Sequence, residues 1–208
     1  PDHCTGTYDS VCSCARSGDC SRRNRKCRHE ACNPTYGHIG TLLARFNQSA
    51  LLGSMRRVWK GIAGDEHLWQ HEWSKHGTCV STLEPRCYGE AYIEGEEVVE
   101  YFATAVEVWG GVPTFKWLAE AGIVPSTDRT YDLADIRAAL GKARGVEAIV
   151  GCQRNELREV WYHFEVLGTV QTGEFVPINP DFTGTRGPGK GCPPTGIRYL
   201  PKETRDEY

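Results

Sequence analysis

The chain has 208 residues and a mass of 23.2 kDa, which suits one domain or two small ones. Its content of 39% hydrophobic and 25% charged residues excludes a disordered chain and a coiled coil. No apolar run approaches the roughly 20 residues needed to cross a bilayer. The net charge is −3, although the segment 12–32 holds six Lys or Arg against two acids. The acidic remainder excludes a broad positive surface, so a nucleic acid would have to be held at a local site.

Ten cysteines indicate an oxidising compartment, because a cytosolic chain of this size seldom has so many without binding metal. No two of them are spaced as CxxC, which argues against a zinc ribbon. Asn47 begins the sequon Asn47-Gln48-Ser49. We therefore expect a secreted, disulfide-bonded glycoprotein.

The first half of the chain is predicted to be loop followed by helices. Residues 1–37 lack hydrophobic periodicity, whereas apolar residues spaced by three and four predict helices further on. The predicted elements, in order, are a helical region His38–Trp59, a turn Gly61–Glu66, a helix Leu68–His76 stopped by Gly77, a loop Thr82–Gly89 and a helix Glu90–Trp109 ended by two glycines.

The second half changes from helical to strand periodicity. Two more helices are predicted at Pro113–Ala121 and Asp132–Ala143, with Asp132 as N-cap. Three segments rich in Val, Ile and aromatic residues are predicted strands: Val146–Cys152, Leu157–Leu167 and Glu174–Ile178. Helices first and strands later indicate an α+β fold with a central antiparallel sheet packed against several helices.

The densest group of reactive side chains is the nine-residue block from His71 to Cys79, His-Glu-Trp-Ser-Lys-His-Gly-Thr-Cys. On a helix, Glu72 and His76 share one face, and Lys75 lies on the same side. An imidazole transfers protons near neutral pH, and a Lys with a second His neutralises charge on a phosphoryl group. RNA cleavage by its own 2′-hydroxyl requires these functions. The alternative is an exposed helix face with incidental ion pairs.

A zinc protease is the other enzyme class that a helix with two histidines suggests. Its motif places the two His residues at i and i+4. His71 and His76 are at i and i+5, about 140° apart around an ideal helix. We therefore do not expect the two rings to converge on a metal.

The same block is similar to the second conserved segment of the T2 family of secreted ribonucleases. The continuation from Val80 to Tyr88 resembles the fungal branch, and Cys152, Cys192 and the segment 196–199 also fit. Residues 1–8 resemble the end of the first conserved segment, which in the family reads His-Gly-Leu-Trp-Pro-Asp. The resemblance covers residues 1–11 and 38–208 and implies one T2-like α+β domain over 1–208.

The resemblance also implies roles for individual residues. His76 would be one of two proton-transfer histidines, Glu72 and Lys75 would stabilise the pentacoordinate phosphorane, and His71 would hold phosphate. At the base sites, Asp2 would hydrogen-bond the base, Tyr8 would stack on it, and Leu68 would form a weaker second site. The implied disulfides are Cys152–Cys192 and Cys12–Cys79. The expected partner is single-stranded RNA, bound by a monomer, with no cofactor, no metal and no membrane partner.

The chain departs from the family pattern in two places. The second proton-transfer histidine of the family lies four residues before the position of Pro1, and strands expected upstream of it are missing too. We therefore expect a fragment or a misread gene start, with impaired activity; an inactive RNA-binding or secreted effector protein of the same fold is the alternative.

The second departure is the Cys- and Arg-rich insertion at 13–37. Three interpretations remain open for it: a retained intron translated in frame, a disulfide-knotted loop with a basic surface for RNA, or a zinc site that uses His29.

Overall fold

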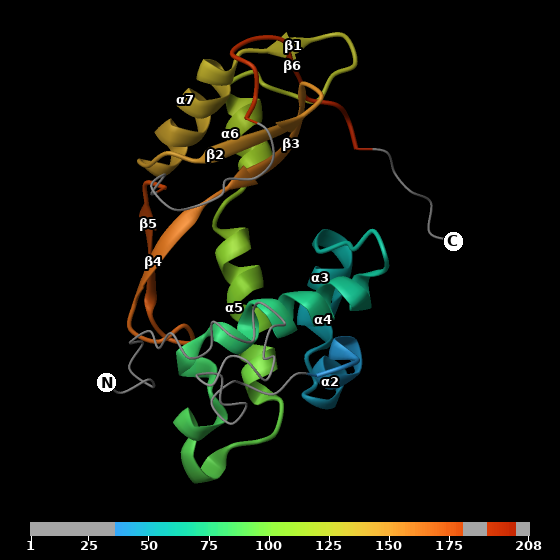
Figure 1. The fold of residues 1–208 in the computed structure, drawn as a ribbon, viewed down its shortest axis with the longest axis vertical. Helices are drawn as coiled ribbons and strands as arrows, with labels where there is room; N and C mark the ends of the chain where they lie inside the picture. The colour runs from blue at the N-terminus through green and yellow to red at the C-terminus, as the bar shows by residue number, and fades with distance from the viewer. Residues whose placement is uncertain (1–35, 181–190, 203–208) are drawn as a thin grey trace, which may run out of the picture. The chain divides into compact units, whose positions relative to one another are not determined.

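The computed structural model describes residues 36–180 and 191–202, which fall into two compact units (Figure 1). The first unit extends to Gly111 and includes the segment Val166–Glu174; the second comprises Val112–Glu165 and the chain from Phe175 onward. The prediction of a single T2-like domain is not tested by this division. The described part of the chain has no helix of the length and apolar character that crossing a membrane requires.

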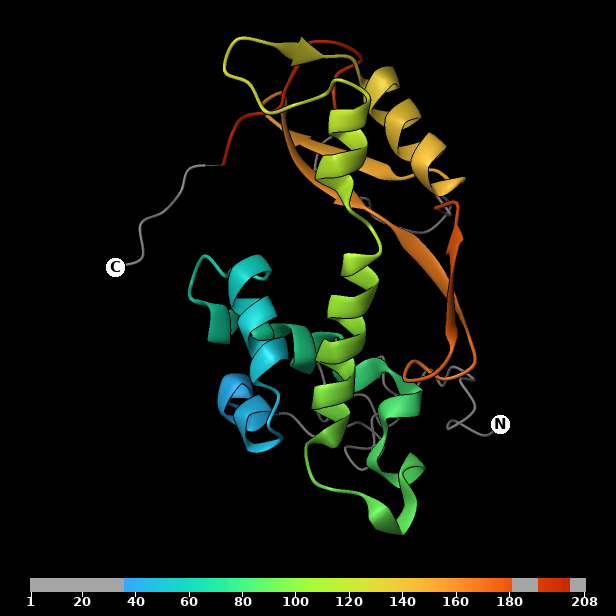
Figure 2. The same ribbon diagram turned by 180° about the vertical axis from the view of Figure 1, so that it is seen from behind.

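The first unit is helical (Figure 2). Its elements are α2 (Ile39–Arg45), α3 (Ser49–Val58), α4 (Asp65–Lys75), the single 3-10 turns η4 (Gly77–Cys79), η5 (Ser81–Leu83), η6 (Pro85–Cys87) and η7 (Gly89–Ala91), and α5 (Glu96–Gly110). The predicted helical region from His38 to Trp59 is confirmed, but Asn47 divides it into two helices because its backbone is left-handed, with φ 57°.

Two of the predicted helix starts in this unit are wrong. The long helix begins at Glu96 instead of Glu90, because Gly95 has φ 97°, outside the helical region. Helix α4 begins at Asp65 instead of Leu68, directly after Gly64 with φ 102°. Asp65 and Glu66 belong to its first turn, where carboxylates are favoured by the helix dipole.

The apolar faces of these helices form one core. Its fully buried members include Ile39 and Leu43 of α2, Met55 of α3, Trp73 of α4 and Phe102 of α5. The three- and four-residue apolar spacing of each helix places these side chains on the face that meets the other helices. This core fixes α4, and with it the block His71–Cys79, in the first unit.

The second unit combines helices and a sheet. Its elements are α6 (Thr114–Glu120), β1 (Thr130–Tyr131), α7 (Leu133–Arg144), β2 (Ile149–Gln153), β3 (Glu156–Trp161), most of β4 (His163–Leu167) and β5 (Glu174–Ile178), and β6 (Ile197–Arg198). A buried cluster that includes Leu118, Ile136, Leu140, Val150 and Ile197 joins α6 and α7 to the sheet. Asp132 occupies the N-cap position of α7, but its side chain makes no capping hydrogen bond.

The strands of the main sheet follow the order β1-β6-β3-β2, and β4 pairs with β5 in a separate two-stranded sheet. Strands β2 and β3 form a hairpin whose two turn residues, Arg154 and Asn155, both have positive φ, as in a type I′ turn. The pair β3–β6 is parallel, joining Glu156 to Arg198, so the sheet is mixed and not purely antiparallel. The predicted α+β fold class is confirmed.

The disulfide Cys152–Cys192 is present and closes a sequence separation of 40 residues. It ties β2 to the segment that leads into β6, and an isolated bridge between Gly151 and Gly191 lies beside it. This pairing confirms one of the two disulfides that the family resemblance implied. The other, Cys12–Cys79, involves Cys12, which lies outside the described residues.

Candidate active site

Helix α4 is anchored at its N-terminal end. The carboxylate of Glu66 accepts hydrogen bonds from the first backbone amides of α2, those of Ile39 and Gly40. Asp65 accepts hydrogen bonds from the Gly61 amide, at 3.0 Å, and from the Lys60 ammonium, at 2.7 Å. Burial opposes ionisation of Asp65, but these two donors hold the pKa of its carboxyl below the ordinary value. The start of the helix is therefore tied to two neighbouring segments.

One face of α4 is apolar and fully packed. Trp69 and Trp73, four residues apart, are both buried, and the Trp69 indole donates to the carbonyl oxygen of Trp59 at 3.0 Å. The ring of Trp73 meets the edge of Tyr101, with centroids 5.6 Å apart. Large aromatic contacts of this kind give the helix a single rotational setting. The exposed side of the helix therefore presents a defined set of polar groups.

The polar face brings Glu72 and His76 together. Nε2 of His76 lies 4.0 Å from Oε2 of Glu72, within ion-pair range but beyond hydrogen-bond distance. The His76 side chain is 60% exposed, whereas that of Glu72 is 25% exposed. The imidazole is thus open to a substrate while the carboxylate behind it is mostly covered. Lys75 is half-buried on the last turn of the same helix.

The two histidines of the block are closer together than their spacing on an ideal helix suggests. The rings of His71 and His76 lie side by side, with centroids 6.1 Å apart and planes at 74°. Helix α4 ends at Lys75, and His76 has φ −118°, so its side chain leaves the ideal helical position. This change of backbone direction turns the two rings toward each other. Yet no group of three His, Cys, Asp or Glu within residues 36–180 and 191–202 is placed to hold a metal ion.

The turn after His76 is closely packed. Gly77, Thr78 and Cys79 are buried, and the Thr78 hydroxyl donates to the Ser74 carbonyl oxygen at 2.9 Å. A Cβ on Gly77 would lie 2.2 Å from the Trp73 ring, so only glycine fits there. His76 therefore lies between helix α4 and this buried turn, and its backbone is held on both sides.

Tyr101 is a contributor that the sequence did not reveal. Its hydroxyl donates to the Glu72 carbonyl oxygen at 3.4 Å, the oxygen that also accepts the His76 amide at 3.0 Å. Burial, and then the negative charge of Glu72, raise the pKa of the Tyr101 hydroxyl above its ordinary value, so it remains a donor. Because 29 residues separate Tyr101 from Glu72, no local pattern signals this contact.

The remaining predicted site residues are placed as follows. Leu68 is half-buried on α4 and precedes His71 by almost one turn. Asn47 is exposed in the turn between α2 and α3, a position open to glycosylation. Asp2, Tyr8 and the insertion 13–37, apart from Tyr36 and Gly37, lie outside the described residues.

The cluster therefore offers an exposed imidazole beside a carboxylate, with a second imidazole and an ammonium on the same helix. An imidazole backed by a carboxylate holds or releases a proton, and cationic groups next to it lower the energy of a dianionic phosphorane. This combination suits proton transfer at a phosphodiester.

Over most of its length the chain is similar to known ribonucleases. Residues 5–176 match the Ribonuclease T2 family. A Ribonuclease T2-like protein of Aspergillus fumigatus is 44% identical over 207 residues, which make up 99% of this chain but only 45% of that relative. Ribonuclease Trv of Hypocrea rufa is 37% identical over 98% of this chain and 76% of its own length. The crystal structure of Actibind, a T2 ribonuclease, superposes with a TM-score of 0.73 and 33% identity, covering 89% of this chain and 73% of Actibind.

Proposed function

Since this chain belongs to the Ribonuclease T2 family, we propose that it takes part in endonucleolytic cleavage of single-stranded RNA. The chain spans less than half the length of the Aspergillus fumigatus relative, so the proposal concerns the part that holds the cluster. The observation that supports it most is the exposed His76 imidazole 4.0 Å from the Glu72 carboxylate, with the His71 ring beside it.

In the proposed reaction, a base removes the proton of the 2′-hydroxyl, and the 2′-oxygen attacks phosphorus in line. An acid then protonates the leaving 5′-oxygen, and the products are a 2′,3′-cyclic phosphate and a free 5′-hydroxyl. His76 performs one of these two proton transfers. Glu72 and Lys75 stabilise the phosphorane, and His71 contacts a phosphate oxygen.

The second proton transfer requires a second group. In the family that group is a histidine four residues before the position of Pro1. We propose that such a partner group and His76 together complete the reaction. The alternative, an RNA-binding protein without cleavage activity, is one of the outcomes of the following experiment.

The experiment is RNA cleavage by the purified 208-residue chain at mildly acidic pH, in the presence of a chelator, beside the variants His76→Ala and His67→Ala. His67 is exposed on α4 and precedes the cluster by one turn, so it serves as the matched control. We expect cyclic phosphate ends that disappear in His76→Ala and persist in His67→Ala. Lys75→Ala and Glu72→Gln should slow cleavage less than His76→Ala does.

Equal cleavage by His76→Ala would remove His76 from the mechanism. No cleavage by a chain that is folded and still binds RNA would establish the inactive alternative instead.

For base recognition, we propose the residues that the family resemblance implied: Asp2, Tyr8 and, at a second base site, Leu68. Asp2→Asn should change the preferred base more than the cleavage rate, which a panel of dinucleotide substrates would measure. An unchanged preference would remove Asp2 from the base site.

We also propose that the protein is secreted and acts as a monomer. The disulfide Cys152–Cys192 and the exposed sequon at Asn47 support secretion, because both features belong to oxidising, glycosylating compartments. A mobility shift on treatment with an N-glycosidase, absent in Asn47→Gln, would test the glycan.

A further inference from the structure

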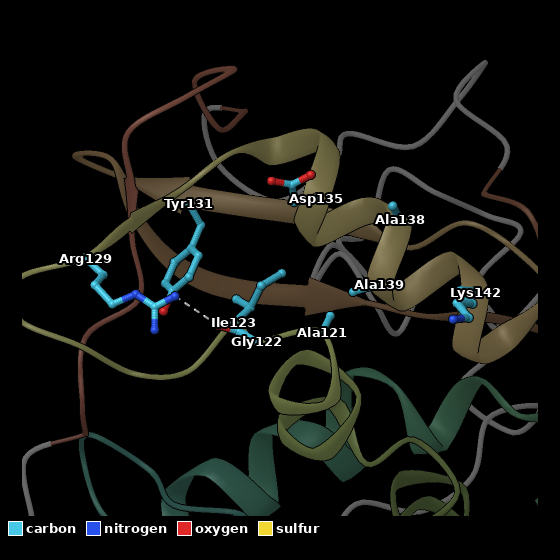
Figure 3. Close-up of a pocket in the computed structure, with 9 residues that line it drawn as sticks. All are labelled: Ala121, Gly122, Ile123, Arg129, Tyr131, Asp135, Ala138, Ala139 and Lys142. Atoms are coloured by element: carbon cyan, nitrogen blue, oxygen red, sulfur yellow. Dashed lines mark hydrogen bonds between the residues drawn. The ribbon is translucent and has the colours of Figure 1, made fainter.

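The second unit contains a pocket that shares no residue with the histidine cluster (Figure 3). Its volume is about 420 Å³, within the range of pockets that bind small molecules. The end of α6, the chain before β1 and one face of α7 form its walls. Small side chains, Ala121, Ala138 and Ala139, line it between the charged groups, so a ligand can approach the backbone of α7 closely.

The charged groups of the pocket are two cations and one carboxylate. Arg129 and Lys142 lie toward opposite ends, and Asp135 lies between them on α7 (Figure 3). Among the residues that the structure describes, no carboxylate is within ion-pair distance of Arg129 or Lys142. Both cations are exposed, and neither forms an ion pair within the described part of the chain, so an anionic ligand can pair with each of them.

Arg129 is held in place before any ligand arrives. Its guanidinium lies over the ring of Tyr131, 5.4 Å from the centroid, and Nη2 donates to the Gly122 carbonyl oxygen at 3.4 Å. Tyr131 is itself buried, and its hydroxyl donates to the Val124 carbonyl oxygen at 2.6 Å and accepts the Val124 amide at 3.1 Å. A guanidinium fixed on a rigid aromatic ring loses little conformational entropy when it binds phosphate.

The separation of the two cations determines the kind of ligand. Asp135 and Lys142 are seven residues apart on α7, which corresponds to about 10 Å along the helix. Arg129 lies on the side of Asp135 that is away from Lys142 (Figure 3). Two cations toward opposite ends of one pocket are best matched by a ligand that places one anionic group near each of them.

We propose that this pocket binds the backbone of single-stranded RNA at two phosphates, one paired with Arg129 and the other with Lys142. The identity of the polymer rests on the proposed function; the match to two linked phosphates rests on the pocket. Asp135, between the cations, accepts a hydrogen bond from a ribose hydroxyl or from a base amino group. The pocket would then hold a stretch of strand through residues that take no part in the proposed cleavage.

The test uses a short oligodeoxynucleotide, which has the phosphates of RNA but no 2′-hydroxyl and therefore stays uncut. Binding is followed by the NMR shifts of the backbone amides of residues 129–142, and affinity is measured at several salt concentrations. The variants are Arg129→Gln and Lys142→Gln. Arg137→Gln is the matched control, because Arg137 is exposed on α7 but does not line the pocket. Thermal unfolding confirms that each variant is folded.

We expect the oligonucleotide to shift these amides and inorganic phosphate to shift them far less. Each pocket variant should lower the slope of log affinity against log salt by about 0.7, the value for one phosphate contact on a single strand. Arg137→Gln should leave the slope unchanged. If all three variants lowered the salt slope equally, the effect would come from net charge alone, and the proposal would be overturned. Amide shifts of equal size with inorganic phosphate, or no amide shifts with the oligonucleotide, would overturn it as well.

The outcome is separate from that of the cleavage experiment. His76→Ala should retain the shifts of residues 129–142 while cleavage is lost. A protein that cleaves RNA but shows no pocket shifts would refute only the pocket. A protein that shows the shifts but never cleaves would refute only the catalytic proposal.

Discussion

The ring of Trp73 occupies the space in which a Cβ on Gly77 would lie, with 2.2 Å between that position and the ring atom Cε3. His76 is placed directly before this contact, at the point where α4 ends. Because Trp73 is fully buried, any movement of its ring would disturb the surrounding core. The contact therefore fixes the position of the turn, and with it the position of the His76 backbone directly before the turn.

Gly77→Ala should destabilise the first unit. Relieving the overlap requires a backbone shift or an unfavourable rotamer of Trp73, at a cost of about 1–3 kcal/mol. Gly110→Ala is the control, since a Cβ there meets no atom within 4 Å and alanine favours the helix. Denaturant unfolding should show a lower midpoint for Gly77→Ala only. Equal midpoints in the two variants would contradict the packing described for Trp73.

Glu66→Ala should also destabilise the first unit, through the anchoring of α2. The carboxylate accepts the amides of Ile39 and Gly40, which have no partner within their own helix. Loss of a helix cap costs about 1 kcal/mol. Glu120→Ala removes an exposed pair with Lys116 and should cost much less. Urea titrations of both variants give the comparison, and an unchanged midpoint for Glu66→Ala would exclude the capping role.

Removal of the disulfide should weaken the second unit. Cys152 and Cys192 close a loop with a sequence separation of 40 residues, for which chain entropy predicts about 4 kcal/mol of stabilisation. The variant Cys152→Ser/Cys192→Ser should unfold at a clearly lower denaturant concentration. Hydrogen exchange would locate the effect: amides of β2 and β3 should lose protection before those of α5. Loss of protection first in α5 would contradict this assignment.

Stability should fall as the pH rises above about 10. Burial raises the pKa of Tyr36, Tyr88 and Tyr101, with further increases from hydrogen bonds or from nearby Glu97, Glu100 and Glu72. These phenols remain neutral in the folded chain, whereas in the unfolded chain they ionise near pH 10. The unfolded state therefore releases protons first and is favoured progressively at higher pH, while below pH 10 the contribution is intact.

Unfolding midpoints between pH 8 and pH 11, with tyrosinate absorbance recorded in parallel, measure this effect. Tyr101→Phe should reduce the pH dependence, because Phe keeps the ring contact with Trp73 but has no ionisable hydroxyl. A midpoint that does not change over this range would contradict the burial of these hydroxyls.

The sequence alone determined the features that depend on near neighbours. The apolar spacing gave helices at α2, α3, α6 and α7, and the change of period gave the strands. The block His71–Cys79 identified the family and predicted that Glu72 and His76 lie close together, because side chains four residues apart meet on an α-helix. The two Trp residues of that block, at the same spacing, form the buried face of α4.

Only the tertiary structure decided the contacts between distant residues. Tyr101 reaches the Glu72 carbonyl oxygen across 29 residues, and β6 pairs in parallel with β3 across the disulfide-closed loop. The His71 and His76 rings meet because α4 ends at Lys75, and the buried Trp73–Gly77 contact fixes the turn that follows. Local propensity sets which residues prefer a helix or a strand, whereas burial of side chains from separate segments sets where each element stops and what it faces.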